Sequence, residues 1–440
     1  MEAEYTHELS RVYGALSARL ENSEEIPMTE IETAFRDAAL RCGAMALSKF
    51  LSEIPETAPR CPNCGELMKN HGRRDKRIVS LLGSCEFSRN YYGCDCGEHA
   101  IPNDGILNIA GTKFTPTVKR VTAQIAASDS FMDTSANLKY LCGIKVSAKE
   151  AERIAEDIGA EIIAVRQEDI TRSLTDLNPP EPETTIKTLY IEYDGTGVPI
   201  RKKELAGVKG KQSDGSAKTR EMKTGAIFTQ SGLDDEGKPM RDVNSTTYFS
   251  QIGKLDDFSQ LLYSEGVKRG VDYAEQVAVI ADGAKWIWNL ADDNFPCATQ
   301  IVDLYHAKEH VFDLLRLTIP DAMELHSQKN QLYKLLEDGD IDGLVSRFSE
   351  FPANTEEQQE RVRIESNYFM QNKERMQYQD FSKRGFFVGS GVIEAACKNV
   401  IGKRLKQSGM MWSVAGANKI AALRCAVMSG EFEPKYQTPA

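Results

Sequence analysis

The stretch LYIEYDGTGVPI at residues 189–200 decides how the fold of this 440-residue chain is interpreted. Apolar and aromatic residues lead up to a carboxylate, Asp194, and Gly195 and Gly197 then interrupt the pattern. An apolar run that stops at glycine is typical of a buried strand that ends in a turn. The sequence therefore predicts a rigid strand that holds a carboxylate in place, where glycine lets a substrate backbone approach.

Two further acids stand in comparable settings. The run VIAD ends at Asp282 and is followed by Gly283, so it repeats the order of strand, acid and glycine. Glu394 lies in a stretch with helical character, on the same helical face as Lys398. Loops beyond the ends of strands are not needed for core packing, so they often carry functional residues. Two acids at the ends of strands in one sheet can therefore lie close together. Three converging carboxylates suit Mg²⁺, whereas each acid alone is typical of a turn or a solvated helix.

The region around these acids is predicted to be a mixed α/β domain. Strand-like runs occupy residues 188–194, 224–230, 246–251, 276–282 and 299–304, and helical patterns occupy 254–266 and 306–317. Residues 307–380 are polar, charged and helical in character. The segment 175–186 is rich in proline and acid, which is typical of a linker.

Residues 1–58 are predicted to be helical. Thr29 and Glu32 have the spacing of a capping box. One helical face then carries a stripe made of Ile31, Phe35, Ala39, Cys42, Ala46 and Phe50. The stripe indicates packing or self-association.

Five of the ten cysteines fall between residues 61 and 96, and this cluster predicts a zinc site. CPNCG supplies Cys61 and Cys64, and YYGCDCGEH supplies Cys94, Cys96 and His99. Zn²⁺ takes four sulfur or nitrogen ligands in a tetrahedron. The second pair of ligands is either Cys94 with Cys96 or one of these cysteines with His99. The alternative is a reduced cysteine cluster without metal.

Residues 118–163 have the length and rhythm of a helix-turn-helix, with helices predicted at 118–129, 134–142 and 148–163. Ser147 and Glu150 form a capping box at the start of the third helix. A recognition helix would enter the major groove there, through residues such as Lys149. The alternative is a three-helix packing unit.

Basic side chains gather where they suit phosphate binding. The segment between the cysteine pairs is basic, and residues 201–223 hold eight Lys or Arg against three acids. Residues 397–407 hold four with no acid. In each case the alternative is a solvated surface. The candidate DNA-contacting residues are Arg73, Arg74, Arg77, Lys149, Lys209, Lys211, Lys398, Lys403, Arg404 and Lys406.

The overall composition is that of an ordinary globular protein, with 41% apolar and 27% charged residues. The net charge of −11 argues mildly against nucleic acid as a partner, but local basic runs weaken that objection. No apolar run approaches the ~18 residues that a membrane span needs. The N-terminal residues lack the apolar core of a secretory signal, so we expect a cytoplasmic location.

The chain resembles the DDE transposases of bacterial insertion sequences, most closely the IS-Kra group, which is similar in turn to the Mutator-like eukaryotic transposases. The resemblance rests on YIEYDGTGVP around Asp194, VIADGAKWIW around Asp282, VDLYHAKEHV around Asp303 and His306, and GSGVIEAACKNVIGKRLKQSGMMWSVAGA around Glu394. Matching features extend from about residue 60 to residue 425. The last motif is the longest and the most specific.

The resemblance implies an α/β ribonuclease-H-like catalytic domain at residues 181–430 with a helical insertion at 307–380. In that fold the first Asp lies on the first strand, the second follows the fourth strand, and the Glu sits on a late helix. A helical N-terminus at 1–58, a zinc ribbon at 59–104, and a helix-turn-helix-like domain with its linker at 105–180 would precede it. The family's ribbon usually has two residues between the second pair of cysteines, whereas here only Asp95 intervenes.

The same resemblance implies the chemistry. Asp194, Asp282 and Glu394 would bind two Mg²⁺ or Mn²⁺ ions, and the ribbon would hold a structural Zn²⁺. Asp303 and His306 would steady the site or contact DNA, and the alternative is an Asp–His pair that caps the helix after the fifth strand. The partners would be double-stranded DNA, as element ends and target, and further copies of the chain, as a homodimer or a larger assembly on DNA. The expected cytoplasmic protein would then be associated with the nucleoid.

We therefore expect a transposase that cleaves phosphodiesters and transfers strands. In phosphoryl transfer an enzyme mainly positions groups and neutralises charge, which carboxylates and basic residues can do. A domesticated DNA-binding or regulatory protein without catalysis is one alternative. A metal-dependent nuclease without strand transfer is the other.

Overall fold

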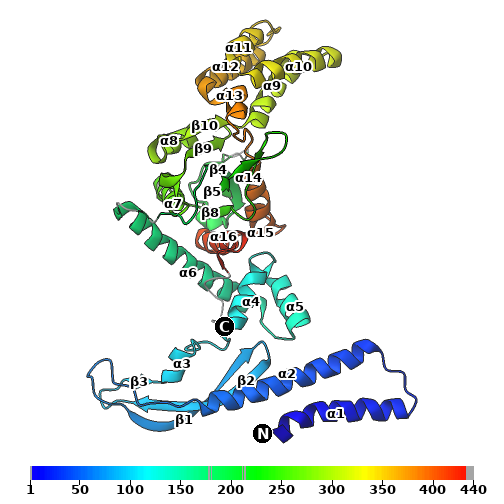
Figure 1. Ribbon diagram of the computed structural model, residues 1–440, viewed down its shortest axis with the longest axis vertical. Coiled ribbons are helices and arrows are strands. Elements are labelled where there is room, and N and C mark those ends of the chain that lie inside the picture. Colours follow the sequence, from blue (N-terminus) through cyan, green and yellow to red (C-terminus); the bar gives the residue numbers. More distant parts are fainter. Residues whose placement is uncertain (1, 177–178, 180, 211, 213–214, 433–440) are drawn as a thin grey trace. The chain divides into compact units, whose positions relative to one another are not determined.

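The computed structural model describes residues 2–176, 179, 181–210, 212 and 215–432 (Figure 1). The chain divides into two compact units, residues 1–155 and residues 156–440. Within the described ranges, no helix combines the length and the apolar character needed to cross a membrane.

The first unit begins with two helices and a long hairpin: α1 (Glu2–Glu21), α2 (Met28–Glu53), β1 (Lys69–Ser80), β2 (Gly83–Gly93) and the short β3 (His99–Ala100). The three strands form an antiparallel sheet in the order β1-β2-β3. Ala44 and Leu51 of α2 pack with Ile78, Cys85 and Phe87 of the hairpin.

Two predictions for the N-terminal helices are wrong in detail. The helix α2 begins at Met28 with Pro27 at its N-cap, so Thr29 is already inside the helix and caps nothing. Phe50, which the predicted stripe includes, is 66% exposed. Helix α2 contacts both α1 and β2, so its buried side is not the single stripe that the sequence suggests.

Four helices complete this unit: α3 (Pro102–Ile106), α4 (Pro116–Ala126), α5 (Phe131–Cys142) and the start of α6 (Ala148–Thr175). The three predicted helices are confirmed, and Gly143 ends α5 with a φ of 70°. The capping box at α6 is also confirmed, because Ser147 N donates to Glu150 Oε2 at 2.9 Å and Glu150 N to Ser147 Oγ at 3.3 Å. Helix α6 runs to Thr175 rather than ending near residue 163.

The second unit is built on a five-stranded sheet, and all five predicted strands are confirmed. They are β4 (Thr188–Pro199), β5 (Thr219–Gln230), β8 (Thr247–Gln251), β9 (Gln276–Ala281) and β10 (Thr299–Val302), in the order β10-β9-β4-β5-β8. Strands β4, β9 and β10 are parallel, whereas β5 is antiparallel to both β4 and β8. Two-residue strands β6 (Gly232–Leu233) and β7 (Pro239–Met240) form a small separate hairpin.

Helices cover both faces of this sheet, which explains why β4 is apolar on both sides. On one face Tyr193 contacts Phe258 of α7 (Leu255–Lys268) and donates to Ile287 O of α8 (Lys285–Asn294) at 2.6 Å. On the other face lie α14 (Gly391–Ala395), a π-helix (Ala396–Gly402) and α15 (Lys403–Leu405). The last helix, α16 (Val414–Met428), packs along β8.

The predicted insertion after β10 is helical, as expected. It consists of α9 (Leu304–Thr318), α10 (Ala322–Asp338), α11 (Ile341–Phe348), α12 (Glu356–Gln371) and α13 (Tyr378–Lys383). Its buried residues Leu332, Leu336, Phe348 and Phe369 belong to the same hydrophobic core as the sheet. Because the core is continuous, the insertion is held firmly against the sheet.

Candidate functional site

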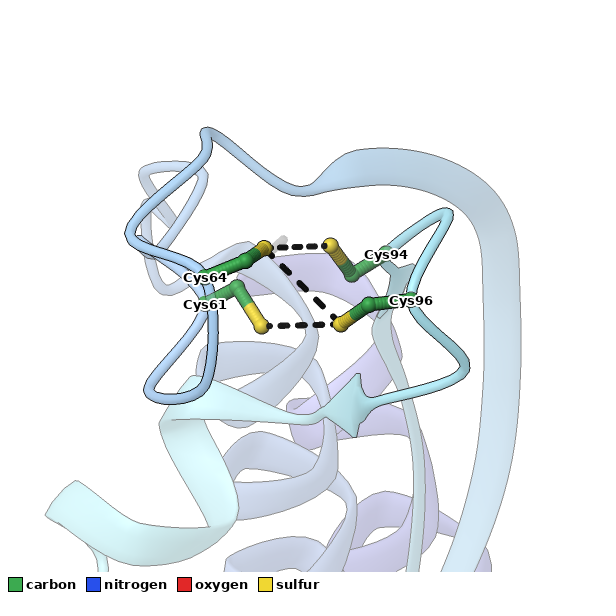
Figure 2. A group of neighbouring side chains, drawn as sticks. All are labelled: Cys61, Cys64, Cys94 and Cys96. Carbon is green, nitrogen blue, oxygen red and sulfur yellow. Dashed lines mark hydrogen bonds between the residues drawn. The ribbon is translucent and has the colours of Figure 1, made fainter.

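The four cysteines of the predicted ribbon lie together (Figure 2). All four sulfur atoms of Cys61, Cys64, Cys94 and Cys96 lie within 4.8 Å of one another. The Sγ–Sγ distances are 3.4 Å for Cys61–Cys96, 3.4 Å for Cys64–Cys94 and 3.8 Å for Cys64–Cys96. Tetrahedral Zn–S bonds of about 2.3 Å give sulfur separations of roughly 3.8 Å. The arrangement can therefore hold a structural metal ion such as zinc.

Both cysteine pairs sit in tight backbone turns. Cys61 N donates to Glu66 O at 2.8 Å, and Cys94 N donates to Glu98 O at 2.8 Å. Each turn uses a glycine with positive φ, 74° at Gly65 and 95° at Gly97. The backbone amide of Cys64 and its neighbours lower the pKa of the Cys61 thiol to about 7. The backbone amides of Glu66 and Glu98 lower the pKa of Cys64 and Cys96, but hydrogen bonds with neighbouring thiols outweigh them, so the pKa of both lies above the ordinary value.

Cys96, and not His99, lies with the other three cysteines. His99 stacks on Tyr91 with ring centroids 5.2 Å apart, and it is not in the four-sulfur group. The single residue between Cys94 and Cys96 therefore does not prevent the second pair from forming.

Several basic residues of the first unit have partners within the protein. Arg73 donates to Ser52 O at 2.7 Å, Arg77 pairs with Glu86 at 2.8 Å, and Lys149 pairs with Glu152 at 2.8 Å. Arg74 lies over the ring of Tyr91, 5.2 Å from its centroid. These contacts reduce the charge that Arg77 and Lys149 can offer to a phosphate.

The two aspartates of the predicted triad lie on neighbouring strands. Asp194 lies in β4, and its Oδ1 accepts a hydrogen bond from Gly195 N at 2.6 Å. Asp282 directly follows β9, and its Oδ1 accepts from Ala284 N at 2.9 Å. A Cβ on Gly195 would lie 2.5 Å from Glu221 Oε1, so a larger residue at this position would displace the flexible Glu221 side chain.

Glu394 is exposed on α14, and its charge interacts with the other acids. The Glu394 carboxyl group is partly shielded from solvent although the residue is exposed overall; this partial burial, followed by the charge of Asp303, raises the pKa of Glu394, and Asp194 adds to that shift. Burial raises the pKa of Asp194, the Gly195 amide lowers it, and the charge of Asp282 raises it again. The pKa of both Asp194 and Glu394 therefore lies above the ordinary value, chiefly because burial disfavours the charged form, with a further contribution from nearby negative charges.

The three acids do not form one tight cluster. Among the described residues, only the four cysteines meet the criterion of three or more possible ligands within 4.8 Å of one another. Oxygen ligands on opposite sides of one Mg²⁺ are about 4.2 Å apart. The three acids in this arrangement therefore cannot all bind one ion.

Glu192 is a site residue that the sequence interpretation missed. It lies two positions before Asp194, on the same face of β4, and it is completely buried. Its Oε2 accepts a hydrogen bond from Ile393 N, next to Glu394, at 2.7 Å. Burial raises the pKa of Glu192 to about 8. The available signal was an acid inside an otherwise apolar strand, since such acids are rarely buried without a role.

Asp303 is buried and joins two elements. Its Oδ1 accepts from His306 N at 2.6 Å, so it caps α9, and its Oδ2 accepts from Ser390 N just before α14. The capping alternative is therefore confirmed through the backbone of His306. Asp303 also fixes the start of the segment that carries Glu394.

The ring of His306 belongs to a polar chain of side chains. His306 Nε2 lies 3.2 Å from His310 Nε2, and His310 Nδ1 lies 2.7 Å from Glu365 Oε2. The His310 ring stacks on Tyr368 with centroids 4.2 Å apart. Tyr368 donates to Asp282 O at 3.0 Å, so the insertion contacts the loop that carries Asp282.

A basic groove of about 880 Å³ begins beside Asp194. Gly195 and Gly197 line it together with four basic side chains, Lys209, Lys218, Arg220 and Lys223. Lys223 pairs with Glu221 at 2.9 Å. The predicted contact Lys211 lies outside the described residues.

The basic run after Glu394 is only partly exposed. Lys398, Lys403 and Lys406 are exposed, and Lys406 donates to Thr196 Oγ1. Arg404 is completely buried, with its guanidinium 5.2 Å from the ring centroid of Trp412. The prediction that Arg404 contacts DNA is therefore wrong, because its side chain is part of the core.

The sequence of this chain matches the model of a protein family. The model of a family described as "Uncharacterised protein family (UPF0236)" matches residues 21–435. A UPF0236 protein of Caldanaerobacter subterraneus subsp. tengcongensis is 21% identical over 97% of this chain and 82% of its own length. A second from that organism is 20% identical over 97% of this chain and 83% of its own length. A UPF0236 protein of Streptococcus gallolyticus, named for the vanSb 3′ region, is 24% identical over 82% of this chain and 74% of its own length.

Proposed function

The chain belongs to the UPF0236 family, and we propose that it is a DNA transposase that cleaves and transfers strands with Asp194, Asp282 and Glu394. The family description carries no activity, so the proposal rests on the geometry of the second unit and on the resemblance of its motifs.

The observation that carries the proposal is the order of the strands and the position of the acids on them. In chain order, β4, β5, β8, β9 and β10 are the first to fifth strands of the sheet. Asp194 lies on the first, Asp282 directly follows the fourth, and Glu394 lies on a late helix. The ribonuclease-H-like domain that the resemblance implies has this arrangement, and the match supports that fold.

Neighbouring acids contribute to the raised pKa values, as expected of a shared cation site. Burial is the largest cause of the raised pKa of Asp194 and of Glu394; the charge of Asp282 adds to the first shift, and the charge of Asp194 adds to the second. Divalent cations bound there would supply activation of a water or 3′-hydroxyl and stabilisation of the leaving oxygen. The protein residues contribute the ligands and hold them on the sheet.

The basic groove supports a phosphodiester substrate. It is lined by Gly195 and Gly197 of β4, and Gly195 directly follows Asp194 in the strand. The lysines and arginine that line it would neutralise phosphates. The cysteine group of the first unit would hold a structural zinc ion and stabilise a domain that contacts DNA.

The names of the relatives give independent support. One Caldanaerobacter relative carries eleven locus labels in its name, and another carries four. Many copies of one sequence in one genome are what repeated transposition of a gene would leave.

The test uses a plasmid that carries this gene with its flanking DNA, incubated with the purified protein and Mn²⁺. We expect nicks at the two ends of the element and joined products. The variants Asp194→Asn, Asp282→Asn and Glu394→Gln should lose at least about 100-fold in rate. Glu236→Gln is the matched control, because Glu236 is exposed on the β6–β7 turn. Cleavage without joining would support the nuclease, and binding without cleavage would support the regulatory protein.

A further inference from the structure

One face of β4 sets the position of the segment that carries Glu394. Tyr190, Glu192 and Asp194 alternate along the strand and therefore point to the same face. Tyr190 Oη accepts from Phe387 N at 3.2 Å. Glu192 Oε2 accepts from Ile393 N at 2.7 Å, and Asp194 Oδ2 accepts from Cys397 Sγ at 3.8 Å. Alternate residues of the strand thus contact successive parts of the segment 387–397.

The start of α14 lacks a cap of its own. The first amides of a helix have no partner within the helix, and a side chain at the N-cap usually accepts from one of them. Ser390 is the N-cap residue of α14, and its side chain makes no such hydrogen bond. Glu192 accepts from the third amide of the helix, and Asp303 accepts from Ser390 N. Two buried carboxyl groups from the sheet region therefore replace the missing cap.

Burying a carboxyl group in the middle of a core strand has an unfavourable free energy. Glu192 is completely buried, and its Oε1 has no hydrogen-bond partner among the described atoms. An apolar residue would fill the same space without that cost. The group is retained at a position from which one side chain determines where Ile393 lies relative to β4.

We propose that Glu192 is the positioning residue of the catalytic site, fixing Glu394 relative to Asp194 by capping α14 from within the sheet. This inference rests on the proposed function. Glu192 and Asp194 are two residues apart on a rigid strand, and Ile393 and Glu394 are adjacent on the helix. The hydrogen bond between Glu192 and Ile393 is therefore the contact between β4 and α14 that lies nearest to both acids in the chain.

Three substitutions separate this role from simple packing. Glu192→Gln keeps an oxygen acceptor at the same reach, whereas Glu192→Leu keeps most of the volume and removes the acceptor. Ile191→Ala is the control for lost stability, because Ile191 is equally buried but points to the opposite face of β4. If Glu192→Leu does not fold, Glu192→Ala serves in its place.

The first measurement is hydrogen exchange of the full chain without DNA or added divalent metal. We expect the Ile393 amide to be protected in wild type, Glu192→Gln and Ile191→Ala, and to exchange at least tenfold faster in Glu192→Leu. Equal protection of this amide in wild type and Glu192→Leu would overturn the capping role. This readout does not depend on whether the protein cleaves DNA.

The second measurement is DNA cleavage as a function of Mn²⁺ concentration. We expect Glu192→Leu to need at least tenfold more Mn²⁺ for half-maximal rate and to be at least tenfold slower, while Glu192→Gln stays within threefold of wild type. An Ile191→Ala protein that changes as much as Glu192→Leu would overturn the positioning role. If wild type itself does not cleave, the proposed function fails, and the exchange result still decides whether Glu192 caps α14.

Discussion

Glu192 and Ile393 are 201 residues apart in the sequence and are joined by a buried hydrogen bond of 2.7 Å. This contact links the central strand of the sheet to the helix that carries Glu394. The contact brings Glu394 near the strand that carries Asp194. In the sequence alone, Glu394 would be interpreted as a solvated helix residue. The proposed active site thus depends on long-range contacts made by residues that take no part in the chemistry.

The cysteine group gives a prediction that does not depend on the transposase proposal. Cys64→Ser removes one of four ligands, so we expect bound zinc to fall from about one equivalent per chain to a small fraction of that. Metal analysis of the purified protein measures this directly. Cys297→Ser is the control, because Cys297 is also exposed and lies outside the group. Equal zinc content in the two variants would exclude the four-cysteine site.

Asp104 stabilises the first unit through two basic partners. Arg89 Nε donates to Asp104 Oδ1 at 2.8 Å, and Lys76 Nζ donates to Oδ2 at 3.1 Å. Burial by itself raises the pKa of Asp104, but these hydrogen bonds outweigh it and hold the pKa below its usual value. Asp104→Asn leaves a buried arginine without its charge partner, so we expect a loss of about 3 kcal/mol at pH 7.

The pH dependence of that loss follows from the direction of the shift. A carboxyl group with a lowered pKa contributes stability above its unfolded value of about 3.9, and this is lost as the pH falls through the folded value. The difference between wild type and Asp104→Asn should therefore shrink between pH 5 and pH 3, as measured by thermal unfolding. A difference that stays constant across this range would contradict the ionic role.

The sequence predicts the sheet and the cysteine group better than it predicts the sides of helices. Apolar runs ending at Asp194 and Asp282 locate two strands, and paired cysteines at turns locate the metal ligands, because these signals are local. Glu192 was not predictable as a capping residue, since its partner Ile393 comes from a distant segment. The helix that follows Glu394 contains a π-helix at Ala396–Gly402, and a period of 3.6 residues then misplaces the side chains beyond it.

The basic run at residues 397–407 predicts an exposed Arg404, whereas this side chain is buried, and the burial can be tested. We expect Arg404→Ala to lower the stability of the second unit by about 3 kcal/mol, because a large buried side chain that stacks on Trp412 is removed. Lys403→Ala should leave stability unchanged, since Lys403 is exposed. Thermal unfolding of the two variants compares them directly. Greater destabilisation by Lys403→Ala would mean that the segment is rotated from the described position.

The groove beside Asp194 makes a prediction about salt. Lys218→Glu combined with Arg220→Glu should weaken binding to DNA of any sequence and reduce the slope of log affinity against log salt by about one per lost phosphate contact. Fluorescence anisotropy at several salt concentrations measures both quantities. Lys238→Glu is the control, because Lys238 is exposed on the β6–β7 turn and pairs with Glu236. If the control changes the slope equally, the groove is not the binding surface.

The central claim is that Asp194, Asp282 and Glu394 jointly hold divalent cations. Its most direct test is anomalous diffraction from crystals of the full chain grown with Mn²⁺ and a DNA end. We predict two manganese peaks about 3.5–4 Å apart, with carboxylate oxygens of all three acids among their ligands. A well-ordered site with DNA in the groove and no manganese at these carboxylates would contradict the account.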